Sequence, residues 1–105
     1  MLVPYSDTAH ERDTLDATPG PLILEFGSNS CGICQAAAPL ISEAMASSTI
    51  AHIRVQDGKG KRLGRSYRVK LWPTLILLLE GKEVGRVVRP SGLQELQNAL
   101  KLLQG

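Results

Sequence analysis

The chain has 105 residues, a length that suits one domain and leaves too little chain for two. Hydrophobic residues make up 43% of it, which excludes a disordered protein. Its formal charge of +2 argues against a nucleic-acid-binding protein held mainly by phosphate neutralisation. The sequence therefore predicts one globular domain over residues 1–105 that does not bind nucleic acid.

Neither a membrane span nor a secretory signal is predicted. The longest strictly apolar run is Leu75 to Leu79, far below the roughly 20 residues that a spanning helix needs. Charged residues, among them Asp7, Glu11 and Arg12, interrupt the start of the chain, where a signal peptide would be apolar. We therefore expect a cytoplasmic protein that does not bind membranes.

The first half of the chain is predicted to form a helix, a strand and a second helix. Thr8 followed by Glu11 fits a capping box and predicts a short helix over 8–16. The apolar run 22–26 predicts a strand buried on both faces. The Ala-rich segment 31–47 predicts a helix, kinked at Pro39.

The second half is predicted to form a strand, a helix, a β-hairpin and a final helix. Strands are expected over 50–55, 74–79 and 83–88, with residues 80–82 forming a tight turn between the last two. A short amphipathic helix is expected over 59–68, and leucines at helical spacing predict another over 93–103. The order of elements predicts an α/β fold.

Two cysteines, Cys31 and Cys34, follow the first strand and open the long helix. At this spacing on a helix both sulfur atoms face the same way and can form a bond. A disulfide that closes so short a loop stabilises a protein by only about 2 kcal/mol, so the pair suits opening and closing. The helix N-terminus favours the thiolate of Cys31, the expected nucleophile, and Cys34 would then resolve the mixed disulfide.

Glu25 is an acidic residue inside the first apolar strand. In apolar surroundings its pKa would be raised, and it would serve as the proton acceptor for Cys34. The alternative is an ordinary exposed strand position.

Two other interpretations of the cysteines stay open. They could form a purely structural pair, or hold zinc with His10 and His52, the only histidines. Zinc requires four ligands, and these histidines lie at no recognisable spacing, so we expect both to be ordinary surface or half-buried residues and predict no metal site.

In these features the sequence resembles the thioredoxin family. The matching features are the strand 22–26, the Cys31-Gly32-Ile33-Cys34 motif, Pro39 in the following helix, Trp72-Pro73-Thr74 before a strand, and the hairpin 80–82. The resemblance covers essentially the whole chain. It implies a thioredoxin fold: a central sheet of mixed direction with four helices on its two faces.

The resemblance also implies a substrate-binding surface. Pro73 would follow a cis peptide bond and lie against the cysteines, and the backbone of Trp72 would pair with an extended substrate peptide. Gly32 and Ile33, between the cysteines, would complete this surface. Trp72 is either core filling or, as we prefer, an apolar platform for substrate beside the cysteines.

Five positions depart from the usual pattern of the family. Ser30 precedes the cysteines where Trp is usual, Ile33 replaces Pro, Glu25 replaces Asp, Gly27 stands where an aromatic residue is common, and Val88 or Arg89 replaces a Gly. These changes affect the redox potential, the substrate groove and recognition by a thioredoxin reductase.

Charge is divided along the chain. Residues 1–58 hold 2 basic and 7 acidic side chains, and residues 59–105 hold 10 and 3. Half of the basic residues lie between Lys59 and Lys70. Such a run is usually a solvated face. The other interpretation is that Lys61, Arg62 and Arg65 attract an acidic protein partner.

Together these features predict a thiol:disulfide oxidoreductase that reduces protein disulfides in the cytosol without a cofactor. Its electrons would come from a thioredoxin reductase or a dedicated donor. Two alternatives remain: an exported oxidant or isomerase, and a thioredoxin-like adapter whose cysteine pair is regulatory or vestigial.

Overall fold

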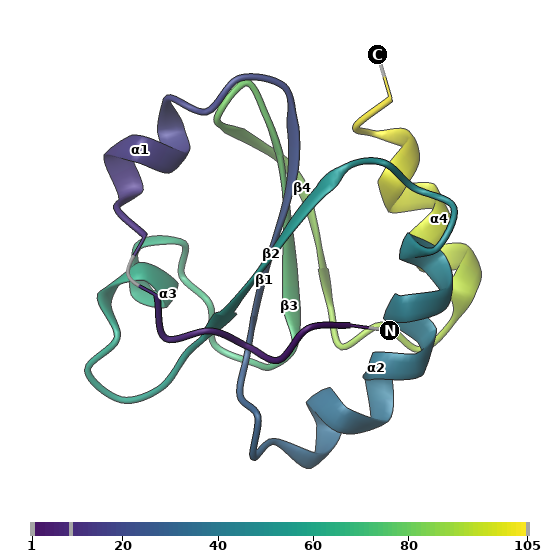
Figure 1. The fold of residues 1–105 in the computed structure, drawn as a ribbon, viewed down its shortest axis with the longest axis horizontal. Helices are drawn as coiled ribbons and strands as arrows, with labels where there is room; N and C mark the ends of the chain where they lie inside the picture. Colours follow the sequence, from purple (N-terminus) through teal and green to yellow (C-terminus); the bar gives the residue numbers. More distant parts are fainter. Residues whose placement is uncertain (1, 9, 105) are drawn as a thin grey trace.

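A four-stranded mixed sheet forms the centre of the protein (Figure 1). The computed structural model describes residues 2–8 and 10–104. Its strands are β1 (Pro21–Gly27), β2 (Ala51–Gln56), β3 (Thr74–Leu79) and β4 (Lys82–Val88), in the order β2-β1-β3-β4. β1 runs parallel to β2, whereas β3 is antiparallel to both β1 and β4. The central strands β1 and β3 are almost fully buried, as their continuous apolar runs predict.

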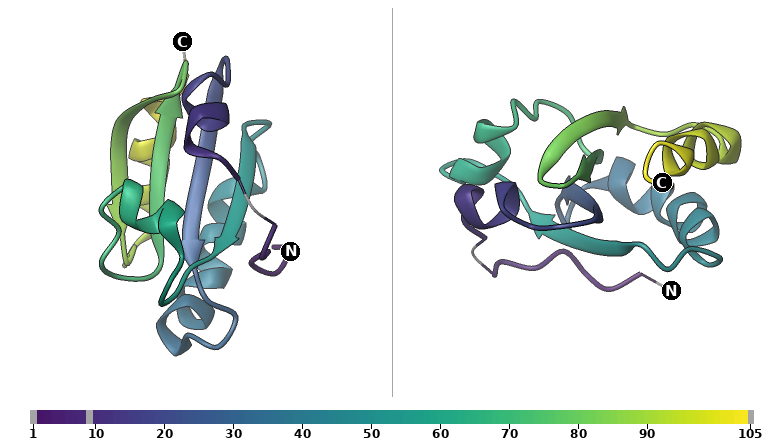
Figure 2. Two further views of the ribbon diagram at one scale, coloured as in Figure 1. Left: turned by 90° about the vertical axis from the view of Figure 1, so that its left-hand side faces the viewer. Right: turned by 90° about the horizontal axis from the view of Figure 1, so that it is seen from above.

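Four helices cover the sheet in two pairs. They are α1 (Arg12–Asp16), α2 (Gly32–Met45), α3 (Arg62–Ser66) and α4 (Leu93–Lys101). Figures 1 and 2 show α1 and α3 on one face of the sheet and α2 and α4 on the other. This arrangement is the predicted thioredoxin fold class. No helix within the described residues is long and apolar enough to cross a membrane.

Alternation along β1 decides which residues face which helices. Ile23 belongs to the core cluster beneath α2 and α4, whereas Leu24 and Phe26 belong to the cluster beneath α1 and α3. Because successive strand side chains point to opposite faces, Glu25 shares the α2 face with Ile23. Glu25 therefore lies beneath the helix that carries the cysteines.

The first helix begins later than predicted. It starts at Arg12, and Glu11 is its N-cap residue, without a side-chain capping bond; the Thr8–Glu11 capping box was wrong. Upstream, Ser6 pairs with the edge of β2: its N–H donates to the Arg54 carbonyl (3.0 Å), and its carbonyl accepts from Gln56 N–H (2.9 Å). This pairing draws the N-terminal segment along the sheet and leaves less chain for a helix.

The other boundaries shift by smaller amounts. α3 is shorter than the predicted 59–68, because Gly60 (φ +83°) precedes it and Arg68 (φ 58°) follows it in left-handed conformations. The hairpin turn consists of Glu80 and Gly81, both with positive φ, as a type I′ turn requires, so β4 begins at Lys82. α2 is helical through Pro39, and the predicted kink there stays a prediction.

Candidate functional site

The two cysteines lie at the N-terminus of α2, directly after β1 and its loop. Cys31 is the N-cap residue, and its sulfur accepts a hydrogen bond from the Cys34 backbone N–H (3.2 Å). Both thiols are free, but Cys31 is partly exposed and Cys34 is 1% exposed. Only Cys31 is therefore open to a partner from solution.

Different surroundings move the pKa values of the two thiols apart. Burial by itself would raise the pKa of Cys31, but hydrogen bonds from the Cys34 side chain and from two backbone N–H groups outweigh it. With the charge of Arg89, they hold the pKa of Cys31 below its usual value. Burial and the neighbouring Cys31 raise the pKa of Cys34 to about 11. Cys31 is thus the more readily ionised thiol of the pair.

Glu25 is fully buried at the centre of a hydrogen-bonded network. It lies opposite Arg54 in the β1–β2 register. Its carboxylate accepts hydrogen bonds from the Tyr5 hydroxyl, from His52 Nε2 (2.8 Å) and from Arg54 Nε and Nη2 (3.1 and 2.9 Å). The predicted placement of Glu25 in an exposed strand position, the alternative interpretation, is therefore wrong.

The pKa expected for Glu25 was also wrong. Burial by itself would raise it, but the hydrogen bonds from His52, Arg54 and Tyr5 and the Arg54 charge together hold the pKa of this carboxyl below its usual value. A carboxylate so well supplied with donors is a weak base. Among the side chains of residues 2–8 and 10–104, its hydrogen-bond partners are those three, and the Cys34 thiol is not one of them.

The loop before β3 lies beside the chain that leaves β4. The Trp72–Pro73 peptide bond is cis. The Arg89 N–H donates to the Pro73 carbonyl, and Arg89 Nε donates to the Trp72 carbonyl, both at 2.9 Å. Because the Arg89 charge also acts on Cys31, this arginine links the Pro73 loop to the cysteines. Arg89 itself has a positive φ of 50°, at one of the positions where a Gly was expected.

The half-buried Trp72 is anchored at its polar edge. Its indole Nε1 donates to Asp57 Oδ2 (2.9 Å). The anchor fixes the ring, and the role of Trp72 as a substrate platform stays a prediction.

A shallow groove adjoins the start of α2. It has a volume of about 240 Å³ and is lined by apolar side chains of α2 and by Arg89, Pro90 and Ser91. Ile33 lines it and is 45% exposed, and a Cβ added at Gly32 would meet open space. Both residues of the motif that separate the cysteines are therefore accessible.

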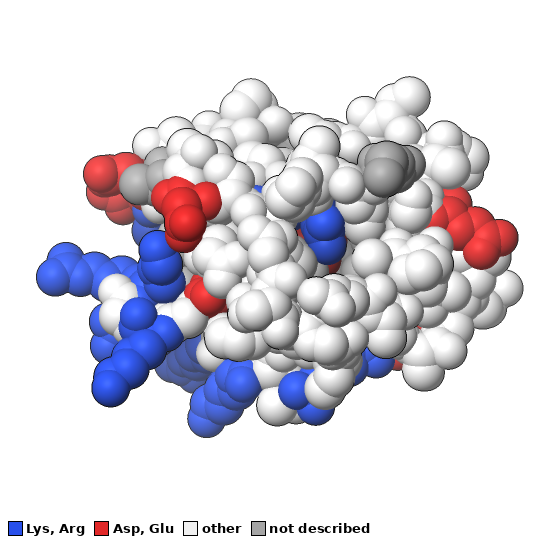
Figure 3. Space-filling model, turned by 60° about the horizontal axis from the view of Figure 1, so that its bottom comes forward, with Lys and Arg blue, Asp and Glu red and all other residues white. Residues whose placement is uncertain are grey.

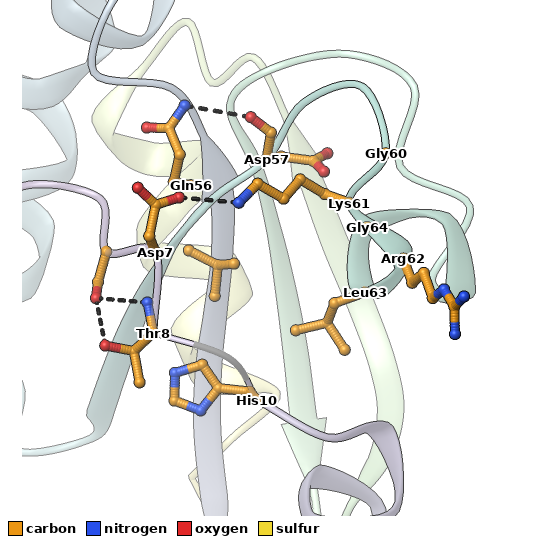
Figure 4. A pocket seen from close by; sticks show the side chains of 12 residues that line it. Asp7, Thr8, His10, Gln56, Asp57, Gly60, Lys61, Arg62, Leu63 and Gly64 are labelled. Atoms are coloured by element: carbon orange, nitrogen blue, oxygen red, sulfur yellow. Dashed lines mark hydrogen bonds and ion pairs between the residues drawn. The ribbon is translucent and has the colours of Figure 1, made fainter.

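Basic side chains gather around α3, away from this groove. The residues are Lys59, Lys61, Arg62, Arg65, Arg68 and Lys70, and all are exposed. In Figure 3, blue Lys and Arg side chains gather at one end of the molecule. Beside them lies a cavity of about 230 Å³, where Lys61 pairs with Asp7 (3.0 Å; Figure 4). Residues from the acidic and the basic halves of the chain thus meet at this cavity.

Sequence reasoning missed three residues of the buried network: Tyr5, His52 and Arg54. His52 is half-buried, as expected, but its contact with Glu25 makes it part of the site. Two signals pointed to the network. Gly27 stands where an aromatic residue is common, and a Cβ there would overlap the Tyr5 ring. His52 and Arg54 also alternate along β2, which places them on one face. Within the described parts of the chain, no three metal-binding side chains gather into a cluster.

Comparisons with known proteins agree with this geometry. A family model described as Thioredoxin matches residues 2–102. A thioredoxin from Mycolicibacterium smegmatis is 31% identical over 106 residues, covering 93% of this chain and 94% of that protein. One from Chlamydia trachomatis is 33% identical over 86 residues, covering 80% of each. The reduced thioredoxin 2 structure from Pseudomonas aeruginosa PAO1 has a TM-score of 0.88 and 48% identity, covering 98% of this chain and 96% of that one.

Proposed function

Because the chain belongs to the thioredoxin family, we propose that it reduces protein disulfides by dithiol–disulfide exchange. The family, the fold and the close cysteine pair support a thiol:disulfide oxidoreductase in general. The contrast between the two thiols carries the finer proposal: one is accessible with a lowered pKa, and the other is buried with a raised pKa.

In the first step, the Cys31 thiolate attacks one sulfur of the substrate disulfide. A bond forms between Cys31 Sγ and that sulfur, the substrate S–S bond breaks, and the second substrate sulfur leaves as a thiolate that takes a proton from solvent. The hydrogen bonds that lower the pKa of Cys31 favour its thiolate, which is the form that attacks a disulfide.

In the second step, Cys34 resolves the mixed disulfide. Cys34 Sγ attacks Cys31 Sγ, the bond from Cys31 to the substrate breaks, and the proton of Cys34 ends on the departing substrate thiolate. Glu25 remains ionised throughout, because its donors hold its pKa low. Its role in the proposal thus changes from proton acceptor to anchor of the groups around Cys34.

The substrate peptide would lie along the loop that ends at Pro73. Its backbone would pair with the backbone of Trp72, and its side chains would contact Gly32 and Ile33. The exposure of these two motif residues and the groove beside them support this placement.

The proposed direction is reduction in the cytosol, where the glutathione poise keeps protein thiols reduced. The oxidised protein would receive electrons from a thioredoxin reductase or a dedicated donor. We also propose that an acidic protein partner docks at Lys61, Arg62 and Arg65, because all three side chains are exposed and belong to the basic run 59–70.

One assay tests the reaction. Dithiothreitol reduces a model protein disulfide with and without the protein, and with its Cys31→Ser variant. We expect acceleration by the native protein alone. Equal rates in all three reactions would contradict the enzyme and favour an adapter. Equilibration with glutathione then gives the reduction potential: a value well above roughly −200 mV would favour an oxidant or isomerase.

A salt series tests the docking surface. We expect the reduction of an acidic substrate to slow steeply with added salt in the native protein. A variant with Arg62→Glu and Arg65→Glu should lose this dependence. The same salt dependence in both proteins would contradict docking at α3.

A further inference from the structure

Arg89 is tied to the loop whose backbone is proposed to pair with the substrate. Its N–H donates to the Pro73 carbonyl and its Nε to the Trp72 carbonyl, both at 2.9 Å. Its φ of 50° is a left-handed conformation that is unfavourable for every residue except Gly. An arginine is thus accommodated here at a cost to the backbone, which indicates a role for its side chain.

The guanidinium of Arg89 is only partly used. Its Nε bond to Trp72 is the one hydrogen bond that the side chain makes within residues 2–8 and 10–104. Arg89 is exposed, so both terminal nitrogens, Nη1 and Nη2, can bind a group from outside the chain. Because Nε is already anchored, the side chain loses less conformational freedom when such a group binds.

Arg86 on β4 shows the contrasting case of an arginine whose carboxylate partner belongs to the chain. It too donates to a backbone carbonyl, from Nη2 to Tyr67 O (2.8 Å). Its Nε and Nη2 also donate to the carboxylate of Glu83, at 2.6 and 2.8 Å. Arg89 has the same kind of backbone anchor, but its one bonded nitrogen is spent on that anchor and no carboxylate of the described residues pairs with it.

Arg89 also lies where a substrate would pass. It is the one charged residue that lines the groove beside the cysteines, and Ile33 and other apolar side chains of α2 form the opposite part of the lining. Its charge acts on Cys31. A peptide that pairs with Trp72 and contacts Ile33 therefore runs past this guanidinium.

We propose that Arg89 is a specificity-determining residue, whose terminal nitrogens bind an acidic side chain close to the reacting cysteine of the substrate. This inference rests on the proposed function and names the substrates that it favours. The planar guanidinium matches a carboxylate through two parallel N–H···O bonds. An extended peptide advances about 3.3 Å per residue, so the acidic residue lies within about two positions of that cysteine.

Short peptides measure this preference. Each has one cysteine, joined by a disulfide to an uncharged nitroaryl thiol, and carries Glu, Gln or Lys at one position near the cysteine. Cys31 Sγ bonds to the peptide sulfur, the peptide–aryl S–S bond breaks, and the coloured aryl thiolate leaves. At one or more positions, we expect the native protein to react about fivefold faster with the Glu peptide than with the Gln peptide. Reaction of each peptide with dithiothreitol corrects for its intrinsic reactivity.

Two variants test whether Arg89 is the source of the preference. In Arg89→Gln the ratio of the Glu to the Gln rate should fall to about one, and in Arg89→Glu the Lys peptide should become the faster substrate. A general change in the reactivity of Cys31 affects all peptides alike and cancels in these ratios. Reaction with the Gln peptide, which does not require Arg89, shows that each variant is folded.

Arg86→Gln is the matched control. It removes an arginine that is also anchored to a backbone carbonyl but already pairs with Glu83. The net charge changes as in Arg89→Gln, and the fivefold preference should remain.

The outcomes distinguish the two proposals. No aryl release by the native protein, or equal release by Cys31→Ser, would overturn the proposed function. Normal release without a preference for the Glu peptide at any position, or with a preference that survives in Arg89→Gln, would overturn only the role of Arg89. Equal loss of the preference in Arg86→Gln would assign it to overall charge and would also overturn this inference.

Discussion

The open end of the cysteine site and its buried interior are built in different ways. At the open end, the Cys31 sulfur accepts hydrogen bonds from backbone N–H groups, and the positive charge of one exposed arginine, Arg89, acts on it. In the interior, Glu25 is held by side chains that reach it from the N-terminal segment and from β2. The open end depends on local chain geometry, whereas the interior depends on the whole fold.

Because of this difference, the open end controls the reactivity of Cys31, whereas the interior contributes to the folding free energy. A side chain at the open end can change with little loss of folding free energy, because water replaces its contacts. A side chain in the interior that is removed leaves a buried charge without a partner, which costs several kcal/mol. Substitutions in the two regions should therefore affect different measurements.

The largest effect is expected from Cys34→Ser, which removes the only thiol that can resolve the mixed disulfide. With a chromogenic aryl disulfide as substrate, attack by Cys31 releases one aryl thiolate and resolution by Cys34 releases the second. In this variant the first release should proceed at the native rate, and the second should disappear. Mass spectrometry should then show the aryl group bound to Cys31. Release of both thiolates by this variant would contradict the assignment of Cys31 as the nucleophile and Cys34 as the resolving thiol.

Next in size is the effect of Glu25→Gln on stability. The variant leaves Arg54 buried without its counterion, and we expect a loss of about 3 kcal/mol near neutral pH, measured by urea unfolding. Glu83→Gln is the control, since Glu83 pairs with Arg86 in a partly exposed ion pair and should cost at most about 1 kcal/mol. Equal losses would contradict the contrast between interior and surface.

The same pair of proteins should differ in pH dependence. Because the pKa of Glu25 is lowered in the folded state, its contribution is present above the unfolded pKa and is lost as the pH falls through the folded value. The native protein should lose stability on acidification over this range, and Glu25→Gln should lose less. Parallel stability curves would show that Glu25 is not held as a carboxylate.

A smaller effect is expected from Arg89→Gln at the open end. Loss of this exposed charge should raise the pKa of Cys31 and slow its alkylation near neutral pH by less than about twofold. Arg65→Gln on α3 serves as the control and should have no effect. An unchanged alkylation profile in Arg89→Gln would show that Arg89 does not lower the pKa of Cys31.

The smallest signal is the fluorescence of Trp72, the only tryptophan. If its indole lies beside the cysteines as predicted, closing the disulfide should change its emission. The Cys31→Ser variant, which cannot form the disulfide, should show no change with redox conditions. Identical spectra of the oxidised and reduced native protein would contradict the platform role.

The sequence predicts the open end better than the interior, for a physical reason. Cys31 and Cys34 are neighbours on one helix, and the strand before them has an apolar pattern, so local rules place them. Tyr5 and Arg54 reach Glu25 only after β2 pairs with β1 and the N-terminal segment pairs with β2. No periodicity in the sequence indicates that these side chains come together. The late start of α1 has the same cause, because the N-terminal segment pairs with β2.

The Tyr5 ring fills the space that a side chain at residue 27 would occupy, so the two positions cannot both carry a large residue. This restricts the order in which substitutions at the two positions can occur. A larger residue at 27 requires that Tyr5 leave first, and Tyr5 can enter only after residue 27 has become small. Either order passes through a chain with an empty space beside the cysteine helix. Protein engineers who graft an aromatic residue onto position 27 should therefore redesign the N-terminal segment in the same step.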